Sequence, residues 1–221
     1  MDGLVVNTCG GNDKAIAAAA GRLPVVLLDR DVADGGIDLV TSNNRELVAG
    51  LVDALAVAGS ERLCLLTEAS DDSPVRRERA EAFVDELSRR GLAGEVVTLA
   101  DGGATGGRLD ETIRDYAGKK LGLIAANGLV FLRLTEALAQ LGPSLPAGLK
   151  IATFDDYPWN HVLFGGVTTA AQDTLAIAER VVERLSERID IVTTTVGDAV
   201  KLAPKRIEIP GHIEHRASTS R

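Results

Sequence analysis

Short apolar runs along the chain each end at a polar residue. The runs at 4–6, 25–28, 63–66, 123–126 and 151–154 lead to Asn7, Asp29, Glu68, Asn127 and Asp155, with Thr67 intervening before Glu68. Runs rich in Val, Ile and Leu without alternation are typical of parallel strands that are covered on both faces. In open sheets of such strands, ligands bind outside the carboxyl ends. The pattern therefore predicts a polar cleft that binds a charged or polyhydroxylated small molecule.

Helical patterns fill most of the segments between these runs. We predict helices over 13–20, 44–58, 76–90, 108–117, 129–141 and 174–188, and strands over 4–6, 24–28, 37–41, 62–67, 95–99, 121–126, 150–154 and 206–210. Asn12 is expected to cap the first helix, and Gly21 to end it. A glycine follows nearly every helix, where it can adopt a left-handed backbone without Cβ strain. Alternating strands and helices predict an α/β fold with doubly wound parallel sheets.

Composition and charge narrow the functional classes. The 221 residues are 45% hydrophobic and carry a net charge of −8, which suits one large or two small domains. No basic block is longer than an arginine or lysine pair, which argues against nucleic-acid binding by this chain itself. No apolar stretch approaches the roughly 18 residues of a membrane span, and the first residues show no secretory signal. We therefore expect no membrane association.

No catalytic or metal-binding constellation is evident. His161, His212 and His215 do not converge at metal-ligand spacing, and there is no G-x-S-x-G elbow. Asp155 and Asp156 are adjacent, so their side chains diverge on an extended backbone and do not form an acid–base pair. Cys9 and Cys64 are expected to be reduced packing residues, and the glycine-rich segment 102–107 a surface loop. We predict a protein without metal or cofactor that is not an enzyme.

Three segments carry a specific resemblance to a known family. They are LPVVLLDR (23–30) with IDLVTSNNRELVAGLVDALAVAGSERLCLLT (37–67), SPVRRERAEAF (73–83) and GLKIATFDDYPWNHVLFGGVTTAAQDTLAIAERVVERL (148–185). In this order they resemble the effector-binding core of LacI/GalR-family transcriptional regulators. The resemblance implies an α/β fold of the periplasmic-binding-protein-like type I, with two doubly wound parallel-sheet lobes joined by three crossovers.

The resemblance also implies how the chain divides between the lobes. Residues 1–41 and 173–211 would form an incomplete N-terminal lobe, and residues 42–172 and 212–221 the C-terminal lobe, with crossovers near Ser42, Gln172 and Gly211-His212. Residue 1 would match the strand that normally comes third, so the resemblance implies a first lobe truncated at its N-terminus and a missing DNA-binding headpiece. We expect the uncovered sheet edge to make the chain aggregation-prone, domain-swapped or dependent on a partner lobe.

Candidate ligand contacts follow from the same resemblance. Asp29, Arg79, Asn127, Asp155 and Gln172 match positions at which the family contacts its effector. A guanidinium suits a carboxylate or a vicinal diol, and a carboxylate can accept from two hydroxyl groups. Each of these residues also has a structural alternative, such as a surface ion pair of Arg79 with Glu81 or Asp85, or a cap or turn.

Further candidates are weaker. Trp159, the only tryptophan, is expected on a loop above the cleft, where its indole could pack on a sugar ring or instead anchor a core or a dimer interface. Asn7 and Glu68 are less favoured ligand contacts. Arg76 and Arg77 are expected to be solvated, although either could reach the cleft from the start of its helix.

The resemblance implies the effector-sensing core of a cytoplasmic regulator or repressor of transcription. It would bind a small sugar or sugar acid between two lobes and control DNA binding by the intact homodimer, while operator DNA would be contacted only through the missing headpiece. VNTCGGND, VVLLDR and FDDYPW look similar to regulators of 2-keto-3-deoxygluconate and related sugar acids. A periplasmic sugar-binding protein of an ABC transporter and an α/β enzyme acting on sugars remain alternatives.

Overall fold

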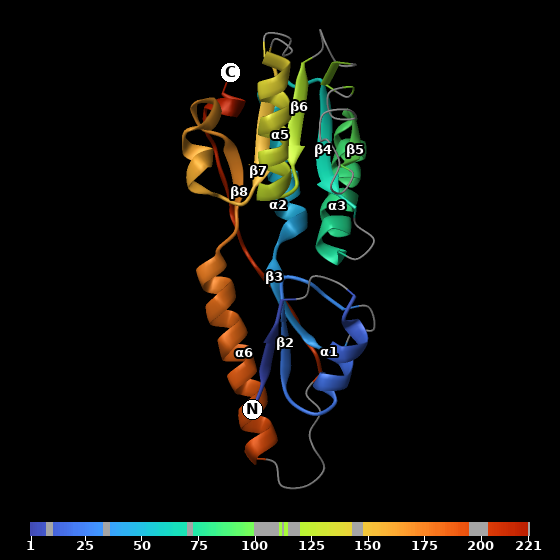
Figure 1. Cartoon of the computed structure of the whole chain (residues 1–221), viewed down its shortest axis with the longest axis vertical. Coiled ribbons are helices and arrows are strands. Elements are labelled where there is room, and N and C mark those ends of the chain that lie inside the picture. Colours follow the sequence, from blue (N-terminus) through green and yellow to red (C-terminus); the bar gives the residue numbers. More distant parts are fainter. Residues whose placement is uncertain are drawn as a thin grey trace. The chain divides into compact units, whose positions relative to one another are not determined.

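The chain contains two compact units (Figure 1). The computed structural model describes residues 1–7, 11–32, 36–69, 73–99, 111, 113–114, 120–142, 148–194 and 203–220. Unit 1 comprises Met1–Asn43, Asp71–Val75 and Asp173–Pro210, and unit 2 comprises Asn44–Ser70, Arg76–Gln172 and Gly211–Arg221. Cys9, the predicted loop at 102–107 and most of the predicted helix at 108–117 lie outside the described residues.

Unit 1 is a parallel sheet with a helix on each face. Its strands are β1 (Leu4–Val6), β2 (Val25–Leu28), β3 (Asp38–Ser42) and β9 (Arg206–Ile209), in the order β1-β2-β3-β9, and its helices are α1 (Asp13–Ala20) and α6 (Thr174–Thr194). Leu27 packs with Ile16 of α1, whereas Val26 packs with Ile177 of α6. Because successive strand residues point to opposite faces, a strand covered on both sides needs a continuous apolar run, as predicted.

Unit 2 has a larger sheet, also covered on both faces. Its strands are β4 (Arg62–Glu68), β5 (Ala93–Leu99), β6 (Leu121–Ala125), β7 (Lys150–Phe154), β8 (Thr168–Ala171) and β10 (His212–Glu214), in the order β10-β8-β7-β6-β4-β5. Among these described strands the pairings are parallel, except that β10 is antiparallel to β8. Helices α2 (Asn44–Val57) and α3 (Pro74–Arg90) pack on one face and α5 (Gly128–Leu141) on the other (Figure 1).

In unit 2, successive residues of β4 pack into two different core clusters, one on each face of the sheet. Leu63 and Leu65 join the cluster that contains Phe83 of α3, whereas Cys64 joins the cluster that contains Phe131 of α5. Burial raises the pKa of the Cys64 thiol to about 12, so this thiol is protonated at neutral pH. The prediction that Cys64 is a reduced packing residue is confirmed.

The sequence pattern missed β8 and misjudged how the first helix is capped. The residues of β8 are Thr-Thr-Ala-Ala, which lack the branched apolar character of the other strands, yet all four are buried between β7 and β10. Gly59 and Gly91 follow their helices with positive φ, as predicted. Gly21 has a φ of −72° and remains right-handed, and the side chain of Asn12 makes no capping hydrogen bond.

Candidate functional site

Four neighbouring strands of unit 2 lead to polar side chains at one edge of the sheet. Glu68 ends β4, Asn127 follows β6, Asp155 follows β7 and Gln172 follows β8. These strands are adjacent and parallel, so the four side chains lie along one carboxyl edge. We call Glu68, Asn127, Asp155 and Gln172 the polar row.

Hydrogen bonds join the members of the polar row. Asn127 Nδ2 donates to Glu68 Oε2 at 3.2 Å, and Gln172 Nε2 donates to Asp155 Oδ1 at 2.6 Å. The backbone N–H of Gly128 donates to Asp155 Oδ2 at 3.3 Å and so links the two pairs. The row is therefore one connected network, with both amide and carboxylate groups at the edge where parallel sheets bind ligands.

Arg76 extends the network from the first turn of α3. Its Nη2 donates to Glu68 Oε2 at 2.5 Å and its Nη1 donates to the Ala69 carbonyl at 3.1 Å. The side chain is 28% exposed, so Arg76 is partly buried rather than fully solvated, and it reaches the end of β4 from the start of its helix. The reason is tertiary, because α3 begins close to the end of β4 and directs Arg76 back onto Glu68. Arg77, as predicted, is exposed.

Arg79 lies one turn further along α3 and is buried, at 5% exposure. Its Nε donates to Asn44 Oδ1 at 2.8 Å, and its Nη1 donates to the Ala126 carbonyl at 2.7 Å. Its guanidinium lies over the Phe154 ring, a favourable cation–π geometry. The alternative of a surface ion pair with Glu81 or Asp85 is not observed, since these carboxylates pair with Arg45 instead. Arg79 thus places a fixed positive charge beside the ends of β6 and β7.

Local backbone geometry orients two members of the polar row. Asn127 is the N-cap of α5, and its Oδ1 accepts a hydrogen bond from the Val130 N–H at 2.9 Å. Asp155 has a φ of 68°, a left-handed conformation that aspartate tolerates better than most residues. Asp156 turns away and accepts a hydrogen bond from Arg216 at 2.8 Å, which confirms that the two adjacent carboxylates diverge.

Asp29 of unit 1 has the same local geometry as Asp155. It directly follows β2, has a φ of 66°, and donates its backbone N–H to the Val40 carbonyl of the neighbouring strand at 2.8 Å. In the same way, the backbone N–H of Asp155 donates to the Ala170 carbonyl of the neighbouring strand β8. The Oδ1 atom of Asp29 is buried and has no hydrogen-bond partner among the described residues. Buried carboxylate oxygens usually accept a hydrogen bond, so this atom can take a further donor.

Trp159 lies in a short helix and not on the loop that the sequence predicted. It lies in the 3₁₀ helix η2 (Pro158–His161), packs against the core cluster of α5 and stacks on Tyr157 with ring centroids 4.5 Å apart. Its Nε1 is buried without an acceptor among the described residues. Tyr157 is the more exposed ring and lies against Gly128, next to the polar row. Asn7 is exposed after β1 in unit 1.

Sequence reasoning gave too little weight to Glu68 and Arg76 and missed Asn44. Glu68 was recognisable as the polar residue that ends an apolar run. Arg76 and Arg79 are three residues apart on a predicted helix and therefore share one face, which was a signal that both could reach the same edge. Asn44 gave no such signal, because its contact with Arg79 joins the start of α2 to the middle of α3.

Two findings concern only the described part of the chain. No group of three or more His, Cys, Asp or Glu side chains there has the arrangement of a metal site. No described helix combines the length and the apolar character needed to cross a membrane.

Comparisons with known proteins agree with this architecture. Residues 52–219 match the family of the periplasmic binding protein-like domain. The chain is 30% identical to the HTH-type transcriptional regulator PtxS of Pseudomonas plecoglossicida and 28% identical to the HTH-type transcriptional regulator KdgR of Bacillus subtilis. Each alignment covers 99% of this chain but only 62% and 63% of the relative, so the chain spans about three fifths of their length.

A solved structure supports the fold. The Cra transcriptional dual regulator of Pseudomonas putida, in complex with fructose 1-phosphate, superposes with a TM-score of 0.79 at 19% identity, covering 98% of this chain and 78% of that one. The expected resemblance to the effector-binding core of LacI-type regulators is confirmed, since both relatives are HTH-type transcriptional regulators and the solved structure is that of a transcriptional regulator. The match over 52–219 shows that the chain belongs to the periplasmic-binding-protein-like domain family.

Proposed function

We propose that this chain is the effector-sensing core of a LacI-type transcriptional regulator, and that it binds a small sugar or sugar acid at the polar row of unit 2. The observation that carries the proposal is the connected network from Glu68 to Gln172, flanked by Arg76 and Arg79. Carboxylates accept hydrogen bonds, guanidinium groups donate them, and amides do both. Hydroxyl groups also donate and accept, so a polyol matches this mixed set.

The relatives support a regulator over a transport protein or an enzyme. PtxS and KdgR are both HTH-type transcriptional regulators, and the Cra structure holds fructose 1-phosphate. These properties are those of the relatives. Control of transcription, DNA contact through a headpiece and residence in the cytoplasm therefore belong to the proposal for the whole protein, as does the absence of catalysis. A periplasmic sugar-binding protein of an ABC transporter is the less favoured alternative.

Arg79 favours a sugar acid over a neutral sugar. Its guanidinium is held by Asn44, by the Ala126 carbonyl and by the ring of Phe154, so the charge is fixed before any ligand arrives. A preorganised guanidinium is a strong partner for a carboxylate, because little side-chain entropy is lost on binding. We place the ligand's carboxylate at Arg79 and its hydroxyl groups along the row.

The proposal includes the division into lobes and a ligand contact in unit 1. Residues 1–41 with 173–211 would be one lobe, and residues 42–172 with 212–221 the other. Asp29 would be the ligand-binding carboxylate of the first lobe, because its buried Oδ1 lacks a donor among the described residues and its backbone geometry repeats that of Asp155. A ligand would shift the equilibrium between lobe arrangements only by its differential affinity for them.

A homodimer completes the proposal, formed through the outer surface of the α5 layer of unit 2. Exposed apolar side chains occur on α5 and in the segment that contains η2 and the adjoining η3 (Leu163–Gly165): Leu129, Leu132, Tyr157, Val162 and Phe164. Apolar clusters that remain exposed commonly mark protein interfaces. Sedimentation velocity on wild type and on Val162→Glu tests this surface, with the dimer expected to dissociate in the variant only.

Calorimetric titration of the 221-residue chain tests the ligand assignment. The panel is D-gluconate, 2-keto-3-deoxygluconate, D-glucose and D-ribose, with succinate as a control that has carboxylates but no hydroxyl groups. We expect saturable binding of a sugar acid and no binding of succinate. If a neutral sugar binds and the sugar acids do not, the sugar-acid assignment is wrong. If nothing in the panel binds to a sample that circular dichroism and sedimentation show to be folded and free of aggregates, the proposed function of the row is contradicted.

A further inference from the structure

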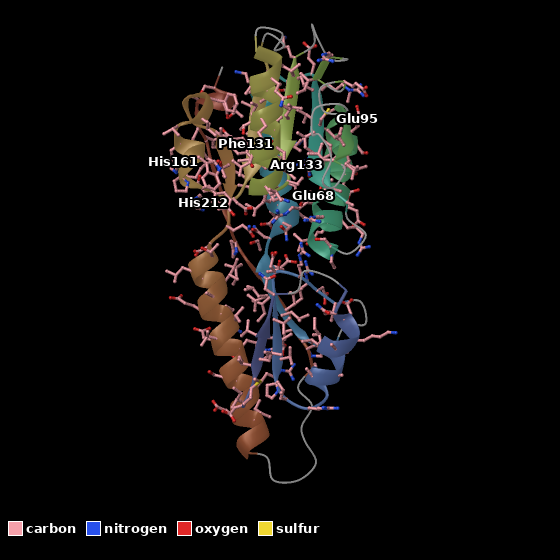
Figure 2. All side chains as sticks on the ribbon, viewed as in Figure 1. Glu68, Glu95, Phe131, Arg133, His161 and His212 are labelled. Atoms are coloured by element: carbon pink, nitrogen blue, oxygen red, sulfur yellow. The ribbon has the colours of Figure 1, made fainter. Side chains whose placement is uncertain are left out.

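Glu68 lies at one end of the polar row and is 8% exposed. Strand β4 lies between β6 and β5, so Glu68 has Leu99 as its neighbour on one side and the residues that follow β6 on the other. Figure 2 shows it at the end of β4 toward which the strand arrow points. A carboxylate so little exposed needs partners, and Arg76 supplies the opposite charge.

The hydrogen bonds of Glu68 are distributed unequally between its two oxygens. Oε2 accepts from both Arg76 and Asn127, whereas Oε1 accepts from no described side chain or backbone group. Oε1 is also absent from the buried polar atoms without a partner, which places it within reach of solvent or of a ligand. Glu68 therefore combines a held carboxylate with one oxygen available as an acceptor.

The same contacts fix the orientation of the Asn127 amide. Its Oδ1 accepts from the Val130 N–H, and its Nδ2 donates to Glu68. Because one partner is a donor and the other an acceptor, the amide cannot be flipped without losing both bonds. One N–H of Nδ2 remains beside the Glu68 carboxylate. The edge thus presents an acceptor and a donor next to each other.

We propose that Glu68 is a specificity-determining residue, which together with Asn127 recognises a single hydroxyl group of the ligand; the inference rests on the proposed function. A hydroxyl group can donate to Glu68 Oε1 and accept from Asn127 Nδ2 at once. An ionised carboxylate oxygen can only accept, so it cannot donate to Glu68 Oε1 and would face that oxygen with no proton between them. The pair therefore selects a hydroxyl at this end of the row and keeps the acidic group of a sugar acid away from it, toward Arg79.

Deoxy analogues test this assignment. D-Gluconate, D-glucose and their single-deoxy analogues at each hydroxyl-bearing carbon are titrated into wild type, Glu68→Ala, Glu68→Gln and Glu95→Gln. Glu95 is a matched control, because it is a carboxylate of the same sheet paired with Arg62, four residues before the β5 residue that neighbours Glu68 (Figure 2). In wild type we expect one analogue to bind about 10- to 100-fold more weakly than its parent, since a buried carboxylate loses its donor.

The ratio of parent to analogue affinity distinguishes the outcomes. We expect it to fall below about 3-fold in Glu68→Ala, to fall partly in Glu68→Gln, which keeps an acceptor oxygen without the charge, and to remain at the wild-type value in Glu95→Gln. A change in stability alone would lower both affinities and leave the ratio intact. An unchanged ratio in Glu68→Gln and in folded Glu68→Ala overturns the inference while the proposed function stands. Failure of wild type to bind any parent compound contradicts the proposed function instead.

Discussion

The guanidinium carbon of Arg79 lies 3.9 Å from the centroid of the Phe154 ring, and Phe154 directly precedes Asp155 in the chain. Arg79 comes from α3 on one face of the sheet of unit 2, whereas Asp155 lies at the carboxyl edge of that sheet. The contact with Phe154 therefore brings a cation and a carboxylate to the same end of one unit. Their separation is set by packing within that unit, so unit 2 by itself can present both charges to a ligand.

Replacing Arg79 by lysine tests how much the shape of the guanidinium matters. Lysine keeps the charge but cannot donate to Asn44 and to the Ala126 carbonyl in the same fork, nor lie flat on Phe154. We expect Arg79→Lys to weaken sugar-acid binding by about 10-fold or more and to destabilise the fold by about 1–3 kcal/mol, measured by calorimetry and urea unfolding. Arg45→Lys, on the exposed surface of α2, is the control and should change neither quantity measurably.

Two variants of Asp155 separate the effect of its charge from the effect of its backbone conformation. Asn tolerates the left-handed φ of 68°, so Asp155→Asn should fold with a melting temperature close to wild type while losing the charge that faces the ligand. Asp155→Val should also strain the backbone, by about 1–3 kcal/mol, because a β-branched residue is disfavoured there. Calorimetry should show weaker ligand binding in both variants. Thermal unfolding should show a lower melting temperature for Asp155→Val than for Asp155→Asn. Equal melting temperatures for Asn and Val would contradict the role of the backbone conformation.

The strands of the row were predictable from sequence because burial on both faces requires continuous apolar runs. Such runs preceded Glu68, Asn127 and Asp155, and the resemblance supplied Gln172. Strand β8 escaped because Thr168–Ala171 is recognisable only from its place between β7 and β10. Local pattern carries no information about which neighbours a short, weakly apolar segment will have.

Side-chain partners were less predictable than strand ends. Arg76 looked like a solvated helix residue, and only the path of the chain from β4 into α3 brings it onto Glu68. Asn44 and Arg79 are 35 residues apart, so their hydrogen bond could not be inferred from spacing. Closeness in sequence was an equally poor guide. Trp159 lies near Asp155 in the sequence, but its side chain packs against the core and stacks on Tyr157.

A buried ion cluster at Asp38 should dominate the acid stability of unit 1. Burial alone would raise the pKa of Asp38, but hydrogen bonds from Arg188, from the backbone N–H of Lys205 and from Arg184 outweigh it and hold the pKa below its usual value. A lowered folded-state pKa means that the stabilisation is present above the unfolded-state pKa of about 4 and is lost as pH falls through the lower folded-state value.

Asp38→Asn tests this cluster. The variant leaves the buried Arg184 with Glu187 as its remaining carboxylate partner among the described residues, so we expect a loss of up to about 3–5 kcal/mol at pH 7 in the unfolding free energy. The difference from wild type should shrink as the pH is lowered below about 4, because Asp38 of the unfolded wild-type chain then binds a proton that the folded chain takes up only at lower pH. Urea unfolding at a series of pH values measures both effects. Glu208→Gln, at an exposed ion pair with Arg206, should change stability by no more than about 0.5 kcal/mol at any pH.

Gly128 should be intolerant of a side chain because of Tyr157. A Cβ atom at Gly128 would lie 2.2 Å from Cε2 of Tyr157, so the ring must swing away in Gly128→Ala and lose its stacking on Trp159. Stacked aromatic pairs contribute about 0.5–1.5 kcal/mol, and we expect a destabilisation of that size. Since Trp159 is the only tryptophan, its fluorescence reports the stack directly.

The double variant separates this steric cause from a general effect of alanine at the start of α5. Tyr157→Ala alone should give the same Trp159 emission as Gly128→Ala, and adding Gly128→Ala to it should cause no further loss of stability, because the clashing ring is already gone. Gly94→Ala is the contrasting case, since its Cβ would lie 2.3 Å from the backbone carbonyl oxygen of Leu63, which no side-chain truncation can remove. If Gly128→Ala leaves the emission of Trp159 unchanged, the ring has not moved and Gly128 is not constrained by Tyr157. If the double variant is less stable than Tyr157→Ala, the loss of stability comes from alanine at the start of α5 and not from the clash with the Tyr157 ring.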